Sequence, residues 1–238
     1  MSDANREAIA ALEDYLRRYP SGHFSELAQL RLDRLLAQLG EKRVQVVSSP
    51  DNPFSKGTVL ANLGYRVGDR YQYRTTDLLT KVQGPHRVAT VTAVTENEVT
   101  YNDGKLVTDL LGNLIKRPDG ATFGPMQYYA TEYSVGRKWA TRYSIVMANG
   151  IPDIVEIDFK VVTREDVTVP AGTFDCFRVE GEGWRLGANG VPPQSIKSTY
   201  WVAPDKVARF VAMETWWRVR SRIMRSDRDE LIQFVRGA

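Results

Sequence analysis

From Gly64 to the C-terminus, short β-rich runs alternate with turn-forming residues, and this rhythm restricts the chain to an antiparallel β architecture. No long helical pattern interrupts the alternation, which argues against a parallel α/β sheet. Because a sheet of about ten strands rarely stays flat, we expect a strongly curved antiparallel β-meander or open barrel. Together with a helical pattern near the N-terminus, this predicts a mainly β fold with a small α appendage (α+β).

Three turn sequences support this prediction. Asn102-Asp103-Gly104 and Asn149-Gly150 favour the positive φ angles of tight hairpins. In the run from Val169 to Thr173, Pro170 fixes φ at the turn and Gly172 can adopt a positive φ. Each sequence lies between two β-rich arms and therefore predicts an antiparallel hairpin.

Two amphipathic stretches precede the β-rich part. Apolar residues recur at helical spacing from Asn5 to Tyr19 and again from Phe24 to Leu39, with Pro20 ending the first stretch. We expect a helical hairpin over residues 1–40, a linker over residues 41–63 and an antiparallel β domain over residues 64–238. Since one helical pair cannot bury both of its faces, the hairpin should dock on the β domain, on a partner or on another copy of itself.

Charge and hydropathy restrict the partners. The net charge of the 238-residue chain is only +3, which does not indicate a nucleic-acid partner. No window approaches the roughly 18 apolar residues of a membrane span, so we expect no transmembrane segment. A removed signal peptide would place the protein in the periplasm or cell envelope, and without one it would be cytoplasmic. The oligomeric state stays open.

The residues that usually carry chemistry are few. Cys176 is the single cysteine and lies in an apolar strand pattern, which is typical of a buried core residue. His23 and His86 share no ligand spacing, and the chain contains neither a G-x-S-x-G nucleophile motif nor a P-loop. We therefore expect no catalytic residues, no metal site and no cofactor, and interpret the protein as a non-enzyme.

Arginines and aromatic residues give the candidate binding site. If Trp216 to Ile223 form one strand, the even-numbered residues share a face and the arginines there form a basic ladder beside an indole. Such a ladder suits a phosphate, a carboxylate or a flat anionic group, or it pairs with acidic residues of neighbouring strands. Tyrosines and tryptophans nearer the middle of the chain could line a pocket or fill the core. The predicted ligand-binding residues are Trp216, Arg218, Arg220, Arg222, Tyr129 and Trp139.

An alternative function is a hydrolase that acts on a saccharide or lipid with carboxylates in a β-sheet cleft. Glu156 and Asp158, and likewise Glu180 and Glu182, are two residues apart and therefore share a sheet face. Two carboxyl groups converging on an accessible pocket would favour this alternative, whereas carboxylates paired with basic side chains would not. The run Gly181-Glu182-Gly183 is interpreted as a bulge or twist.

Three segments resemble the TapB-like, domain-of-unknown-function proteins of the bacterial envelope. They are Tyr65-x-Val67-Gly68-Asp69-x-Tyr71-x-Tyr73, the run from Val169 to Val179, and Thr199-Tyr200-Trp201-Val202-Ala203-Pro204. The N-terminal stretch resembles a single tetratricopeptide-like helical pair. The resemblance implies a secreted or periplasmic domain with an open β-barrel-like sheet, and it supplies no catalytic residues. We expect an envelope protein that binds a hydrophobic or anionic ligand, or a protein partner, on a curved sheet.

Overall fold

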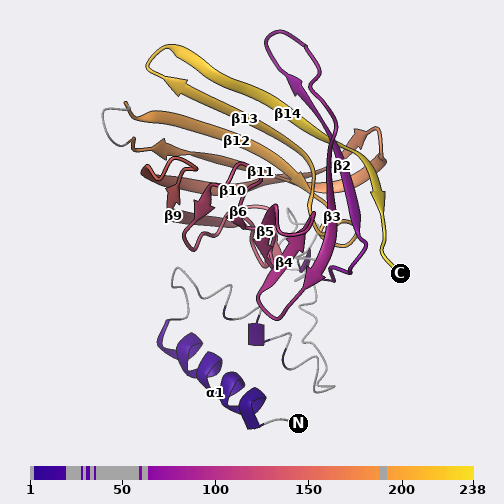
Figure 1. The fold of residues 1–238 in the computed structure, drawn as a ribbon, viewed down its shortest axis with the longest axis vertical. Helices are drawn as coiled ribbons and strands as arrows, with labels where there is room; N and C mark the ends of the chain where they lie inside the picture. The colour runs from indigo at the N-terminus through magenta and orange to yellow at the C-terminus, as the bar shows by residue number, and fades with distance from the viewer. Residues whose placement is uncertain are drawn as a thin grey trace.

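The structure is a computed structural model that describes residues 3–19, 28, 31, 32, 35, 59–60, 64–187 and 192–238. Most of these residues belong to strands, and the one helix of more than a turn that they contain lies outside the sheet (Figure 1). The elements are α1 (Asp3–Arg18), β1 (Val59–Leu60), β2 (Arg70–Asp77), β3 (Arg87–Val94), β4 (Glu98–Tyr101), β5 (Leu106–Asp109), β6 (Leu114–Lys116), β7 (Thr122–Phe123), β8 (Glu132–Tyr133), β9 (Lys138–Val146), β10 (Pro152–Val169), β11 (Gly172–Arg185), β12 (Gln194–Val202), β13 (Phe210–Val219) and β14 (Arg222–Val235).

The strands close into an antiparallel barrel. Neighbours follow the order β10-β11-β12-β13-β14-β2-β3-β4-β5-β6-β7-β9, and β9 pairs with β10 to complete the ring. The mainly β fold with an α appendage is thus confirmed. The barrel is closed rather than open, because the short strand β7 pairs with β9 through Thr122 and Phe123.

Alternation of side chains explains why the sheet has a dry inner face. In β10, Val155, Ile157, Phe159 and Val161 are buried, whereas the residues between them are more accessible. The register shifts in several strand pairs, for example between Val161 and Thr163, and such bulges bend strands. Bending lets long strands such as β10 and β14 wrap around one core.

The predicted hairpin turns are confirmed. Val169 pairs with Gly172 across the Pro170–Ala171 turn, and Gly172 has a φ of 132°. Positive φ angles also occur at Asn102, Asp103, Gly104 and Gly150, as their sequences predict. The local turn chemistry therefore sets these reversals.

The N-terminal prediction is only partly described by the structure. Helix α1 coincides with the first predicted helix, and it lies below one end of the barrel in Figure 1. Of the second predicted helix, residues 28, 31, 32 and 35 are helical, and the rest lies outside the described residues. The predicted linker also lies outside them, apart from β1, which pairs with β8 through Tyr133 and Glu132.

The interpretation of Gly181 and Gly183 as a bulge is wrong, since the β10–β11 register is continuous there. Both glycines instead allow close approach. A Cβ on Gly181 would lie 2.7 Å from Cδ1 of the Phe159 ring, and a Cβ on Gly183 would collide with the Glu156 carbonyl oxygen. Cys176 is fully buried, as predicted, and burial raises the pKa of its thiol to about 12.

Candidate functional site

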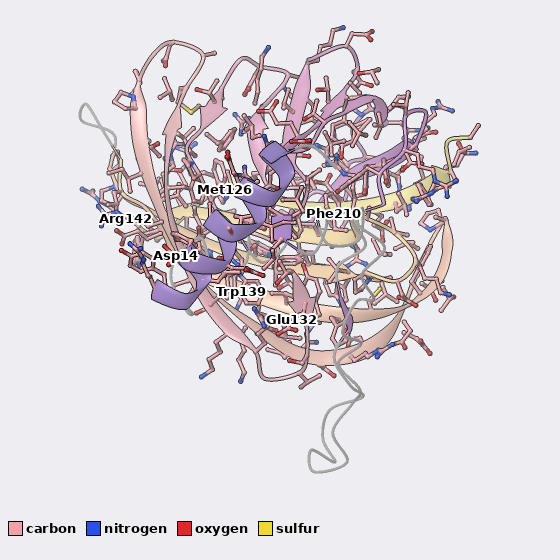
Figure 2. The ribbon with its side chains drawn as sticks, turned by 90° about the horizontal axis from the view of Figure 1, so that it is seen from below. Asp14, Met126, Glu132, Trp139, Arg142 and Phe210 are labelled. Atoms are coloured by element: carbon pink, nitrogen blue, oxygen red, sulfur yellow. The ribbon has the colours of Figure 1, made fainter. Side chains whose placement is uncertain are left out.

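The barrel encloses a cavity of about 340 Å³. It extends along the inner face of β13, from Phe210 at the start of the strand to Trp217 near its end. In Figure 2, where the molecule is seen from below, Met126 and Phe210 of the cavity wall lie inside the ring of strands. At the usual rise of a strand, the cavity wall spans roughly 23 Å between Phe210 and Trp217. The cavity wall therefore follows most of the length of β13.

Aromatic and aliphatic side chains make up most of the wall. Tyr128 and Tyr129 contribute from the segment between β7 and β8, and their rings pack at 5.5 Å from each other. Tyr143 of β9 and the aliphatic residues Val155 and Ile157 of β10 also line the cavity. Burial raises the pKa of the Tyr128, Tyr129 and Tyr143 hydroxyls, so these hydroxyls remain neutral at physiological pH.

Five arginines also contribute to the wall, and four of them are neutralised by an aspartate. Arg87 pairs with Asp229 at 2.5 Å. The four pairs are Arg87–Asp229, Arg117–Asp119, Arg185–Asp153 and Arg225–Asp227. Trp217 lies between two of these arginines, with Arg185 at 6.0 Å and Arg225 at 5.3 Å from its ring. The fifth arginine is Arg209.

A polar turn after β5 holds the tyrosines in place. Asp109 accepts hydrogen bonds from the Asn113 backbone at 2.9 Å and from its amide nitrogen at 2.8 Å. The Asn113 side-chain oxygen in turn accepts hydrogen bonds from the backbone amides of Tyr128 at 2.7 Å and Tyr129 at 2.9 Å. Gly112 and Asn113 themselves line the cavity, so this network shapes one wall.

The Asp109 network makes stability depend on pH. Burial raises the pKa of Asp109 to about 6, although hydrogen bonds from Asn113 and Leu111 favour the charged form. Because the ordinary value in an unfolded chain is about 3.9, the unfolded state releases this proton first as pH rises. We expect this group to lower the free energy of unfolding by about 2–3 kcal/mol between pH 4 and pH 7.

Urea unfolding of Asp109→Asn and of the natural sequence across this pH range measures the effect. The difference in the free energy of unfolding between the variant and the natural sequence should change with pH. Asp109→Asn should become more stable relative to the natural sequence as pH rises. Asp103→Asn is a suitable control, because Asp103 is exposed and its positive φ tolerates asparagine. Parallel pH profiles for Asp109→Asn and the natural sequence would contradict the assigned pKa.

The prediction that Arg218, Arg220 and Arg222 form a ladder on one strand is wrong. Trp216 and Arg218 share the outer face of β13, with the guanidinium 5.8 Å from the indole ring. Arg220 lies in the β13–β14 turn with a φ of 53°, and Arg222 begins β14 opposite Val219. The reason is a two-residue turn at Arg220 and Ser221, which interrupts the predicted strand. These residues lie outside the cavity wall, and their binding role stays a prediction.

Tyr129 and Trp139 lie on the inner side of the barrel. Tyr129 lines the cavity. Trp139 stacks on Phe159 at 5.3 Å and donates a hydrogen bond to the Gln127 carbonyl at 3.1 Å, so it packs behind the wall. Tyr129 thus belongs to the wall of the cavity, whereas Trp139 packs against the core. A ligand contact by either residue stays a prediction.

The carboxylates of the hydrolase alternative are on the outer surface. Glu156 pairs with Arg142 at 2.8 Å, and Glu182 pairs with Lys197 at 2.9 Å. Glu180 lies 3.4 Å from Arg178. The cross-strand pairing of acids with bases is therefore present, although the basic partners are not the predicted arginines. None of these glutamates is among the residues that line the cavity.

Sequence reasoning missed Arg209. The signal was present, because Arg209 interrupts the apolar run Val207-Ala208-Arg209-Phe210-Val211-Ala212. A charged residue inside such a run is rarely buried without a function or a partner. Its neighbours in space, however, are tyrosines of β2 and β4, which no local pattern connects to it.

Comparisons with known proteins give only distant similarities. No protein-family profile matches the sequence, and no curated protein matches it. Among solved structures, the chain is similar to a putative lipoprotein from Parabacteroides distasonis, with a TM-score of 0.47 and 14% identity over 74% of this chain and 100% of that one. It is also similar to a putative exported protein with YmcC-like fold from Bacteroides fragilis, with a TM-score of 0.48 and 12% identity over 75% of this chain and 100% of that one. For the hypothetical lipoprotein YmcC from Escherichia coli, the TM-score is 0.44 and the identity is 10% over 69% of this chain and 83% of that one.

The TapB-like resemblance and the tetratricopeptide-like character of the hairpin remain predictions. In the part of the chain that the structure describes, no helix has the length and apolar character needed to cross a membrane.

Proposed function

We propose that the protein is a non-enzymatic binding protein that holds a small hydrophobic or amphipathic ligand inside its barrel. The observation that supports this proposal is the cavity of about 340 Å³ with its mainly apolar wall. Protein interiors normally contain few voids larger than a water molecule, and ligand pockets occupy roughly 300–1,000 Å³. The size of the cavity therefore fits a ligand better than a packing defect.

The electrostatics of the wall favour binding over catalysis. A carboxyl group that acts as a general acid or base must be free to exchange its proton with the substrate. Asp229, the carboxylate on the wall, instead accepts a 2.5 Å hydrogen bond from Thr75 and pairs with Arg87. The glutamates of the hydrolase alternative are on the outer surface in ion pairs. We therefore retain the non-enzymatic function.

An envelope location belongs to the same proposal. It rests on the resemblance of the strand and turn segments to TapB-like envelope proteins. Fractionation of cells that produce the natural gene product checks it: a periplasmic or membrane fraction is expected, and a purely cytosolic protein would reject the location.

Binding is tested with N-phenyl-1-naphthylamine, a neutral apolar dye that becomes fluorescent in apolar surroundings. We expect the purified protein to bind the dye at one saturable site. Met213 projects from β13 into the cavity wall, so Met213→Trp should occupy part of the free volume and weaken binding by about tenfold or more. Titration by fluorescence measures both affinities.

Met224→Trp is the matched control. Met224 is exposed and does not line the cavity, so this substitution adds the same side chain without filling the site. Equal dye binding by the two variants, or no saturable binding by the natural sequence, would reject the cavity as the ligand site. Circular dichroism of both variants checks that the barrel remains folded.

A further inference from the structure

Arg209 differs from the other arginines of the cavity wall because it has no carboxylate partner. The four others each pair with an aspartate, whereas no ion pair joins Arg209 to an acidic group among the described residues. The polar groups that act most strongly on its charge are hydroxyls of tyrosines, including Tyr101 and Tyr73. Its Nη1 atom is shielded from solvent and has no hydrogen-bond partner.

Aromatic rings enclose the guanidinium. Its central carbon lies 5.0 Å from the Tyr101 ring, 5.7 Å from Tyr71 and 5.9 Å from Tyr73. The Phe210 ring lies at 6.0 Å. Cation–π contacts of this kind stabilise a cation without neutralising it, and a buried charge without a counter-charge is costly. The surroundings therefore favour an anion next to Arg209.

The segment around Arg209 is held firmly. Tyr65 donates a hydrogen bond to the Ala208 carbonyl and Tyr73 donates one to the Phe210 carbonyl, both at 2.9 Å. These bonds fix the backbone on either side of Arg209 before any ligand arrives. The Tyr71 hydroxyl, which is buried next to the guanidinium, also has no partner. Because burial raises the pKa of Tyr71, its hydroxyl stays neutral and does not supply a counter-charge to Arg209.

We infer that Arg209 binds the head group of an amphipathic monocarboxylate whose hydrocarbon chain extends along β13. This inference rests on the proposed binding function and specifies its ligand. Arg209 lines the cavity, so its guanidinium supplies a charge-assisted hydrogen bond to a carboxylate oxygen there. The single unpaired cation matches one negative charge, since the other arginines of the wall are already neutralised. The rest of the wall is mainly apolar and follows β13 from Phe210 to Trp217, which suits a hydrocarbon chain.

The experiment compares ligands that differ only in the head group. Decanoate, decanol and decyltrimethylammonium compete with N-phenyl-1-naphthylamine for the natural protein at pH 7.5. We expect decanoate to bind about ten- to a hundredfold more tightly than decanol, and the cation to bind least. Decyl phosphate is tested in the same series and should bind no more tightly than decanoate, because Arg209 offers one positive charge.

Substitution then assigns the preference to Arg209. Arg209→Gln should lose most of the preference for decanoate, measured as the ratio of the decanoate and decanol affinities within that variant. Arg209→Lys keeps the charge and should retain part of the preference. The matched control is the triple variant with Arg218, Arg220 and Arg222 changed to Gln, which removes three exposed arginines and should leave the preference unchanged.

The outcomes are distinguishable. Equal affinities of the natural protein for decanoate and decanol would overturn the role of Arg209 and leave the binding function standing, whereas no binding of dye or any competitor would reject the binding function itself. A full decanoate preference in Arg209→Gln, or its loss in the triple variant, would place the anion site elsewhere. Should Arg209→Gln fail to fold, the preference of the natural protein and Arg209→Lys still decide the question.

Discussion

Asp153→Ala is expected to lower the free energy of unfolding by about 3–5 kcal/mol, the largest effect we predict. The Asp153 side chain is 2% exposed and pairs with Arg185, whose side chain is 14% exposed. Asp153 also accepts hydrogen bonds from the backbone amides of Ile154 at 2.8 Å and Gly187 at 2.9 Å. Removal of the carboxylate leaves the Arg185 charge buried beside Trp217 and three donors without an acceptor.

Two further variants show whether the charge is the cause. Asp153→Ala combined with Arg185→Met should recover part of the loss, because it removes the uncompensated charge along with its partner. Glu182→Ala breaks an ion pair with the exposed Lys197 and should cost less than about 1 kcal/mol. Urea unfolding measures all three. A loss in Asp153→Ala no larger than in Glu182→Ala would contradict the buried pair.

Gly183→Ala should destabilise the barrel by about 3 kcal/mol or more. A Cβ at this position would collide with the Glu156 carbonyl oxygen and lie 2.7 Å from the Ile157 Cα. Both are main-chain atoms of β10, so neither can rotate away as a side chain would. The methyl group can be accommodated only if the β10–β11 pairing opens locally.

Gly84→Ala is the matched control for this substitution. The nearest atom to a Cβ on Gly84 is the Thr75 carbonyl oxygen at 3.8 Å, an ordinary contact, and Gly84 has no positive φ. Its effect on the free energy of unfolding should stay within about 0.5 kcal/mol. Equal unfolding midpoints for the two variants would show that β10 yields readily at Glu156.

The placement of Arg209 gives these stability effects a functional context. The barrel neutralises Arg185 with Asp153 even though the pair is largely buried, but leaves Arg209 among tyrosines. A binding protein gains from this difference, because an unpaired cation is available to a ligand and a paired one is not. Under the proposed function, stability and recognition therefore depend on different arginines of one wall.

Local patterns in the sequence predicted the elements that depend on neighbouring residues. The alternation of Val155, Ile157 and Phe159 with charged residues determines which face of β10 is buried. The turn at Pro170 and the burial of Cys176 follow from equally local chemistry. The strand break at Arg220 was missed because Arg220 and Ser221 lack the glycine or asparagine that usually marks a tight turn.

The sequence by itself determined the fold class, the inner face of the strands and most hairpin turns, since these depend on side-chain period and turn chemistry over a few residues. Tertiary structure alone decided that β7 and β9 close the barrel, that Arg87 pairs with Asp229, and that Arg209 meets Tyr71 and Tyr101. The Arg87–Asp229 pair and the contacts of Arg209 with the two tyrosines join residues more than a hundred positions apart, and they depend on strand order and register. No pattern within a short window of sequence contains that information, so the site became visible only when the sheet closed.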